Sequence, residues 1–299
     1  GTAVTNACTN ISYGGSGILE YKGSGAQTTT NCEFPSTSGP STLKIENNNS
    51  TGVTLHAART VTTLTIGGSV SNSIFNDNGN QLTATGGTLN LTSGTFKLGS
   101  AGTATNWPGF GTNNIASGTT VEYVAGVAQN VSAAPSYHHL TFSGAGTKTT
   151  ASGTTTVLGD WTTSGGVAAL NTNNSNVTVT GDIEGTGNIT SGSGTISLQG
   201  AWNNSGTYTA NTGTINYSNA TGGQTIVNLP YNNLTLSNSS GTNSAGGNLT
   251  VGGALTTATG GTLDMGASYT LGGTLGTITN NGTIKTSVPT TTNSAPIAS

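Results

Sequence analysis

Three tandem copies of one residue pattern fill most of this chain of 299 amino acids, and they limit the folds open to it. Tyr123 and Tyr217 lie 94 residues apart, and Tyr137 and Tyr231 keep the same spacing. Internal repetition at a fixed period is typical of repeat proteins. The predicted segments are an N-terminal cap or assembly segment (1–16), copy one (17–117), copy two (118–212), an incomplete copy three (213–285) and a Thr/Pro tail or linker (286–299).

A shorter rhythm lies inside each copy. Gly followed by Thr and then by an alternating pair recurs along the chain, as at Gly118-Thr119 and Gly194-Thr195. Glycine suits a tight turn, and strict alternation, as in residues 177–180, suits a half-buried strand. The pattern therefore predicts short strands in coils of about 20–25 residues, with about four coils per copy.

The composition excludes several classes of protein. Six Lys and Arg and nine Asp and Glu make 5% of the chain charged, against about 25% in an ordinary globular domain. So few positive charges form no basic stripe, and nucleic acid is not an expected partner. The chain has no apolar run of about 18 residues, so no membrane-spanning helix is predicted. Good helix formers are scarce while Thr, Val, Ile and Gly are common, which predicts an all-β fold.

Together these features favour a β-solenoid, similar to a parallel β-helix, with about 12 short coils. A propeller needs about 40–50 residues per blade, and three copies would not close a ring. Tandem β-sandwiches are the alternative, but the Gly-Thr rhythm continues through the copy boundaries without a clear linker. A solenoid also accounts for the low charge, because like charges stacked on neighbouring coils would repel.

Residues 140–149 read Leu-Thr-Phe-Ser-Gly-Ala-Gly-Thr-Lys-Thr and resemble a motif of long β-strand-repeat proteins of bacterial surfaces. Residues 248–285 are similar to the solenoid passengers of autotransporter and filamentous-haemagglutinin-type adhesins. The resemblance implies display outside the cell, and adhesion or assembly instead of catalysis. We therefore expect an extracellular or cell-surface structural protein, a filament subunit or adhesin shaft, whose secretion signal has been removed.

Cys8 and Cys32 are the two cysteines of the chain. Two cysteines cannot form a four-ligand structural zinc site. A disulfide between them would close a loop of about 25 residues and stabilise the fold by roughly 3 kcal/mol. Such a bond also fits an oxidising, extracellular environment. Two unpaired thiols are the alternative.

Few residues suggest chemistry. Asp182 and Glu184 stand at positions i and i+2, so both carboxylates would point to one side and are candidates for calcium coordination. A solvated turn is the alternative. His138 and His139 would face opposite sides of a strand, which disfavours a shared metal. The other acidic residues fall on different coils and Arg59 is the only arginine, so we expect no catalytic residues, no cofactor and no enzyme activity.

Three tryptophans are candidates for stacking on sugars: Trp107, Trp161 and Trp202. Trp161 and Trp202 share a Gly-x-Trp context, which also fits packing at a coil corner. A carbohydrate-binding surface module for host or matrix glycans is therefore the alternative function. Ice binding through Thr-x-Thr pairs such as Thr178 and Thr180 is disfavoured, because the pair does not recur regularly along the sequence.

The ends of a solenoid expose strand edges that invite further pairing. Copy three reaches Lys285 and lacks a counterpart of residues 192–212, whereas the region of the two cysteines is a candidate cap. We therefore expect head-to-tail assembly into a homopolymer, in which residues 1–16 of the next subunit complete the C-terminal end. The alternative is that this chain is one segment of a longer adhesin.

Overall fold

The computed structural model describes residues 11–164, 170–171 and 175–287. Within these ranges every helix or strand assigned is a β-strand, which confirms the predicted all-β class. In this described part, no helix is long and apolar enough to span a membrane. The chain comprises two compact units, one of Gly1–Lys148 with Ser164–Val167 and one of Thr149–Thr163 with Ala168–Ser299.

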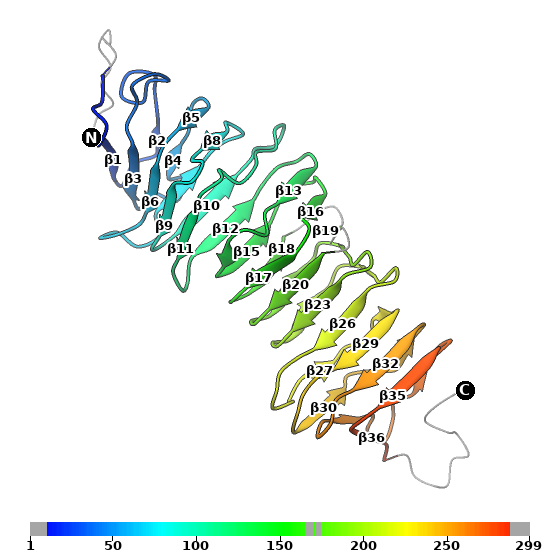
Figure 1. Cartoon of the computed structure of the whole chain (residues 1–299). Helices are drawn as coiled ribbons and strands as arrows, with labels where there is room; N and C mark the ends of the chain where they lie inside the picture. Colours follow the sequence, from blue (N-terminus) through cyan, green and yellow to red (C-terminus); the bar gives the residue numbers. More distant parts are fainter. Residues whose placement is uncertain (1–10, 165–169, 172–174, 288–299) are drawn as a thin grey trace. The chain divides into compact units, whose positions relative to one another are not determined.

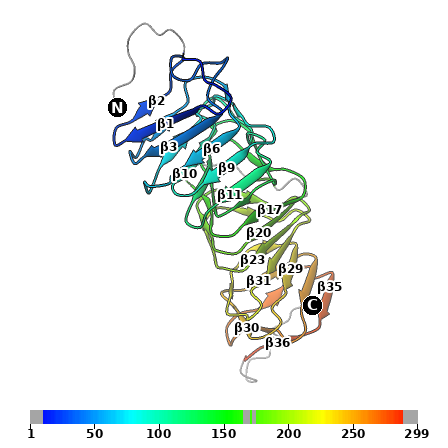
Figure 2. The ribbon, with the colours of Figure 1, turned by 60° about the vertical axis from the view of Figure 1, so that its left-hand side comes forward.

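Two main sheets build the first unit, and their strands come from successive coils (Figures 1 and 2). One sheet has the order β1 (Ile18–Gly23), β3 (Thr42–Asn47), β6 (Thr63–Ile66), β9 (Thr88–Leu91) and β11 (Thr112–Ile115). The other sheet has nine strands, six of which belong to this unit, in the order β2 (Gln27–Thr28), β4 (Val53–Thr54), β7 (Ile74–Asn76), β10 (Thr95–Leu98), β12 (Thr120–Tyr123) and β15 (His139–Phe142). The remaining strands are β5 (Arg59–Thr60), β8 (Leu82–Thr83), β13 (Gln129–Val131) and β14 (Ser136–Tyr137).

The second unit has a more regular layout, in which each strand usually pairs with the third strand after it. Its longest row is β17 (Thr154–Val157), β20 (Asn176–Val179), β23 (Thr195–Leu198), β26 (Thr214–Tyr217), β29 (Asn233–Leu236), β32 (Ala254–Thr257) and β35 (Thr277–Asn280). Figure 2 shows β17, β20, β23 and β29 of this row in succession.

Two further sides of the second unit are each built from two rows. One side holds β18 (Trp161–Thr163), β21 (Ile183–Gly185) and β24 (Trp202–Asn204), then β27 (Thr225–Ile226), β30 (Thr242–Ala245), β33 (Thr262–Asp264) and β36 (Thr283–Lys285). The other holds β16 (Lys148–Thr150), β19 (Leu170–Asn171), β22 (Ile189–Thr190) and β25 (Tyr208–Thr209), then β28 (Pro230–Tyr231), β31 (Leu249–Val251) and β34 (Leu271–Gly272).

Parallel pairing of each coil with the next defines the architecture. Val177 lies opposite Ile196, and Ile196 lies opposite Ile215, so one coil takes 19 residues at this point. In the first unit Leu43 lies opposite Leu64, a separation of 21 residues. The chain is a β-solenoid of about 12 turns, as the sequence predicted, and it is not a series of sandwiches.

Alternation along each strand separates the core from the surface. Ile215, Leu234 and Leu255 occupy the same inward position on successive coils, and all three are fully buried. The outward neighbours Asn216, Thr235 and Thr256 are only partly buried. Aromatic rings continue this stacking in the first unit, where Phe75 and Phe96 lie with ring centroids 5.7 Å apart. Burial of these columns is the main source of stability, because neighbouring coils share one continuous apolar interior.

Close approach between coils explains why glycine is needed at particular turns. Gly185 has a φ of +104°, and a Cβ atom there would lie 1.7 Å from the carbonyl oxygen of Thr163 on the neighbouring coil. Any larger residue would be strained by its backbone conformation and would also clash with that backbone.

The long sequence repeat does not span a whole number of coils. Val251 on β31 is the counterpart of Val157 on β17, 94 residues earlier, yet these two strands belong to different sheets. Because β31 is the fourteenth strand after β17 and a coil has three strands, one copy spans between four and five coils. Equivalent residues of successive copies therefore lie on different sides of the solenoid.

The inward columns predict that substitutions at two neighbouring residues of β29 change the stability of the fold by very different amounts. Leu234→Ala removes a fully buried side chain from the inward column and should destabilise the fold by about 2–5 kcal/mol. Thr235→Ala, on the outward face of the same strand, should change stability by no more than about 0.5 kcal/mol. Urea unfolding followed by circular dichroism would test both; equal effects would contradict the assignment of inward and outward faces.

Candidate functional site

Most lysines on the outer faces are paired with a carboxylate on a neighbouring coil. All 15 charged residues lie in the described part of the chain. Four of the five lysines stand directly opposite a carboxylate in the strand register: Lys44 opposite Glu20, Lys22 opposite Glu46, Lys97 opposite Glu122 and Lys285 opposite Asp264. Their ammonium nitrogens lie 2.8–3.0 Å from these carboxylate oxygens. Stacked coils therefore accept charge where the partner on the neighbouring coil has the opposite sign.

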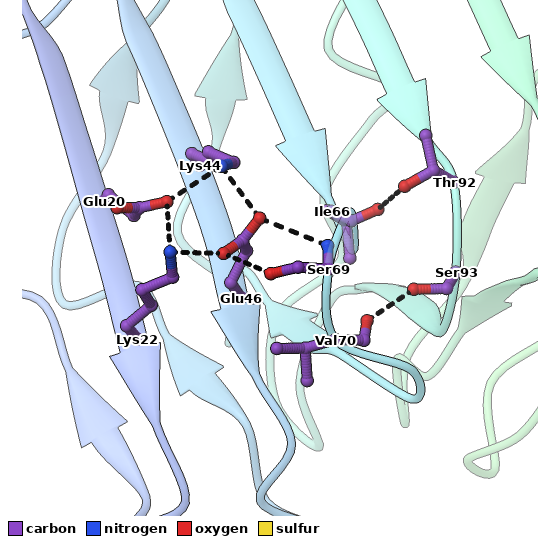
Figure 3. A network of polar contacts seen from close by, with 9 residues as sticks. All are labelled: Glu20, Lys22, Lys44, Glu46, Ile66, Ser69, Val70, Thr92 and Ser93. Atoms are coloured by element: carbon purple, nitrogen blue, oxygen red, sulfur yellow. Dashed lines mark hydrogen bonds and ion pairs between the residues drawn. The ribbon is translucent and has the colours of Figure 1, made fainter.

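Glu46 is the centre of the largest of these networks (Figure 3). Its carboxylate lies 2.8 Å from the ammonium groups of both Lys22 and Lys44, and it accepts a hydrogen bond of 3.0 Å from the hydroxyl of Ser69. Glu20 bridges the same two lysines from β1. The bonds from Lys22 and Lys44 lower the pKa of Glu46 to about 2, so it stays ionised although its side chain is only 3% exposed.

The buried charged side chains of Lys148 and Asp77 form their hydrogen bonds with other groups of the protein. The Lys148 ammonium donates to the carbonyl oxygens of Ala125 and Gly146 at 2.7 and 2.9 Å, and burial lowers its pKa to about 8. Asp77 accepts hydrogen bonds from the amide of Gly99 and from the Thr105 hydroxyl, and burial raises its pKa. These contacts give both residues a structural role at coil corners.

The acidic pair Asp182 and Glu184 flanks the buried Ile183, so both side chains project outward from β21. The Asp182 carboxylate accepts hydrogen bonds from the Ala201 amide at 2.7 Å and from the Asn203 side chain at 3.0 Å. Within the described residues, no group of three or more His, Cys, Asp or Glu could hold a metal ion. Through its bonds to Ala201 and Asn203, Asp182 connects its own coil to the next one.

His138 and His139 do not face opposite sides, and that expectation was wrong. Their rings meet edge to face with centroids 4.3 Å apart. His138 stands between β14 and β15, outside either strand, so the alternation of a strand does not apply to it. Its ring instead contacts the preceding coil, at 2.9 Å from the Ser117 hydroxyl and 3.1 Å from the Gly118 amide.

The three tryptophans pack against the protein itself. Trp161 is fully buried, and Trp202 is 5% exposed, with its ring edge to face with Tyr208 at 5.3 Å. Trp107 is partly buried and lies about 6 Å from the rings of Phe96, Phe110 and Tyr137 (centroid distances 5.9, 5.8 and 6.0 Å). Trp161 and Trp202 thus present no open ring face to a sugar.

The repeated tyrosines and glutamine form a polar cluster within a coil. Tyr123 and Tyr137 join hydroxyl to hydroxyl at 2.8 Å, and the Gln129 amide group donates to the carbonyl oxygens of Leu98 and Thr105 at 3.0 Å. The equivalent residues of copy three, Tyr217, Tyr231 and Gln224, repeat this arrangement. The most obvious sequence motif of the chain therefore has a structural role, because its polar groups satisfy buried backbone atoms.

Cys8 lies outside the described residues, so the predicted disulfide with Cys32 remains a prediction. Cys32 lies in a loop where its amide donates to the Thr30 hydroxyl at 3.2 Å.

Both ends of the described solenoid present strand edges. Among the described strands, β1 pairs with β3 alone and β35 pairs with β32 alone. Residues 11–13 run beside residues 32–38, through bonds from the Ile11 amide to Cys32 and from the Tyr13 amide to Ser38, and form no strand with β1. Ile18 is 62% exposed on β1, and Ile278 is 42% exposed on β35. These two edges are the most evident interaction surfaces of the fold.

Comparison with known proteins adds no relative. No family model matches this chain, and neither the curated proteins nor the solved structures contain a significant match.

The Glu46 network predicts an acid-sensitive contribution to stability. Because the folded-state pKa lies below the ordinary value of 4.5, this contribution is present above pH 4.5 and is lost as the pH falls towards 2. Glu46→Gln should be less stable than the wild type at pH 7, and the two should converge near pH 2. Unfolding midpoints measured across this range would test it.

Glu184→Gln supplies the matched control for that measurement. Glu184 is also outward-facing, but its carboxylate forms no ion pair with the other described residues. The prediction would be contradicted if the difference in unfolding midpoint between Glu46→Gln and the wild type stayed constant from pH 7 to pH 2.

Proposed function

We propose that this protein is an extracellular structural protein, a subunit of a surface filament or the shaft of an adhesin, which assembles head to tail. The observation that carries the proposal is the pair of open strand edges, β1 on the first coil and β35 on the last described coil. A contact between two different surfaces of the same molecule generates a filament when it does not close into a ring.

The apolar residues at the two edges suit each other. Ile278 takes the inward position that Leu234 and Leu255 hold on the preceding coils, but it is 42% exposed because no described coil covers it. Leu19 holds the corresponding inward position at the other end, where it begins the column that continues to Leu43. Stacking β35 of one subunit against β1 of the next would place Ile278 against Leu19 and continue the apolar column.

The backbone supplies the second component of this contact. An edge strand carries a row of N–H and C=O groups that pair readily with another strand. In each unit the coils already associate through parallel pairing, at a spacing of about 4.7–4.9 Å between strands. Addition of a further coil from another subunit uses the same geometry, so it requires no rearrangement of either edge.

Several features support a structural role over a catalytic one. Most of the charged groups described above are bonded to one another or to other groups of the protein, and the repeated tyrosine–glutamine motif satisfies buried polar atoms. The low charge and the resemblance to surface β-repeat proteins support a location outside the cell. Glycan binding is the alternative function, at a part of the surface other than the buried Trp161 and Trp202.

Single substitutions at the two edges would test the head-to-tail contact. Lysine at an edge blocks strand addition, so Leu19→Lys and Ile278→Lys should each abolish the long thin fibres expected of the wild type. Each variant keeps one intact end, so an equimolar mixture should form dimers and no longer species. Electron microscopy and light scattering after size exclusion would measure these states.

Leu158→Lys is the matched control for those variants. Leu158 is 51% exposed in the turn after β17 and belongs to neither edge strand, so this variant should still form fibres. Wild-type protein that stays monomeric at every concentration, or edge variants that still polymerise, would contradict the proposal.

The proposed location also predicts an intact disulfide. Cys8 and Cys32 should resist alkylation until the denatured protein is reduced, as shown by mass spectrometry. Cys32→Ala should destabilise the protein by roughly 3 kcal/mol if loop closure is the source of the stabilisation. Alkylation of both cysteines without a reductant would overturn the assignment.

A further inference from the structure

A small groove lies on the side of the second unit, where the chain turns from β33 towards β34. Its volume is about 210 Å³, and it is lined by Ser244, Ala245, Asp264, Gly266, Ala267, Ser268 and Tyr269. The groove joins two neighbouring coils, because Ser244 on β30 stands directly opposite Asp264 on β33. None of its lining residues lies on the edge strands β1 and β35 that the proposed assembly uses.

Tyr269 gives this groove an aromatic surface. It is 37% exposed and is the one aromatic residue among the exposed large hydrophobic side chains in the described part of the chain. Trp161 and Trp202, by contrast, are buried. An aromatic ring that combines an apolar face with exposure to water suits the apolar face of a sugar ring.

Polar groups of different kinds lie in the groove or next to it. Three polar residues lie in register on the successive strands β30, β33 and β36: Ser244, Asp264 and Lys285. Asp264 accepts one bond from the Gly266 amide at 2.8 Å and one from Lys285 at 2.9 Å. An ionised carboxylate has about four acceptor positions, so two remain for hydroxyl groups of a ligand. The Asp264 carboxylate is ionised at neutral pH, and the bond from Lys285 lowers its pKa further.

The charges of the groove select among sugars. Lys285 neutralises Asp264, so the groove has no net charge to attract a uronic or sialic acid. The remaining carboxylate positions accept hydrogen bonds, which the hydroxyl groups of any hexose can donate. Both features favour an uncharged hexose over an acidic one.

We propose that this groove binds one ring of a neutral hexose, with its apolar face on Tyr269 and its hydroxyl groups bonded to Asp264 and Ser244. A single ring in an open groove of this size gives affinity in the millimolar range. This inference goes beyond the proposed structural role and does not depend on it, because a monomer contains every residue of the groove. In a filament, each subunit would add one copy and avidity would rise without new contacts.

Saturation-transfer NMR on the whole chain tests the groove directly. The probes are the methyl glycosides of glucose, galactose and mannose, with methyl glucuronide as the acidic comparison. We expect saturation of at least one neutral glycoside, and weaker or no saturation of the glucuronide. Tyr269→Ala should weaken binding about tenfold, the scale of losing one stacking ring. Asp264→Asn should also weaken it.

Tyr269→Phe is the matched control, because it keeps the ring that stacks and should therefore keep the affinity. Circular dichroism shows whether each variant is folded. If Tyr269→Ala does not fold, the affinities of Asp264→Asn and Tyr269→Phe are compared to test the proposal. Binding of none of the three neutral glycosides would overturn the proposal, as would binding that both Tyr269→Ala and Asp264→Asn leave unchanged. Fibre formation is measured separately from sugar binding. A failure of the groove proposal is therefore distinguishable from a failure of the head-to-tail contact.

Discussion

Parallel pairing between equivalent positions of successive coils is the constraint on which the rest of this structure depends. Each residue is stacked between one residue on the preceding coil and one on the following coil. Its side chain must therefore pack well beside a similar or complementary side chain at a spacing of about 4.8 Å. Apolar residues satisfy this requirement inside, where Ile215, Leu234 and Leu255 form one column. Threonine and asparagine satisfy it outside, and charge is tolerated where the stacked partner has the opposite sign, as with Lys97 and Glu122.

The features that the sequence predicted correctly are those encoded within a few residues. Alternation within segments such as 177–180 identifies a strand and its inward face, because that pattern does not depend on any distant residue. Glycine before threonine marks the turns, and the scarcity of helix formers excludes a helical fold. A solenoid follows from such local signals, because each of its coils repeats the same short elements.

The pairing of charges could not be predicted in the same way, because it depends on the length of every coil. Glu20 faces Lys44 across 24 residues, whereas Asp264 faces Lys285 across 21. An error of one residue in a coil would move every side chain of the next strand to the opposite face. Tyr269 was missed for a related reason: its exposure depends on how a turn outside the strands projects. For His138 the error had the opposite origin, since strand alternation was applied to a residue between two strands.

The mismatch between repeat and coil has a consequence for function. Because one sequence copy spans between four and five coils, Val157 and Val251 lie in different sheets although they are equivalent in sequence. A recognition feature duplicated with the repeat would therefore point in different directions, and the duplicated tyrosine–glutamine cluster is indeed internal and structural. In the described part of the chain Tyr269 is the one aromatic residue among the exposed large hydrophobic side chains, so a regular array of such grooves requires a regular array of subunits. Assembly through the end coils would supply that array, and binding that is weak at one groove would then depend on the length of the filament.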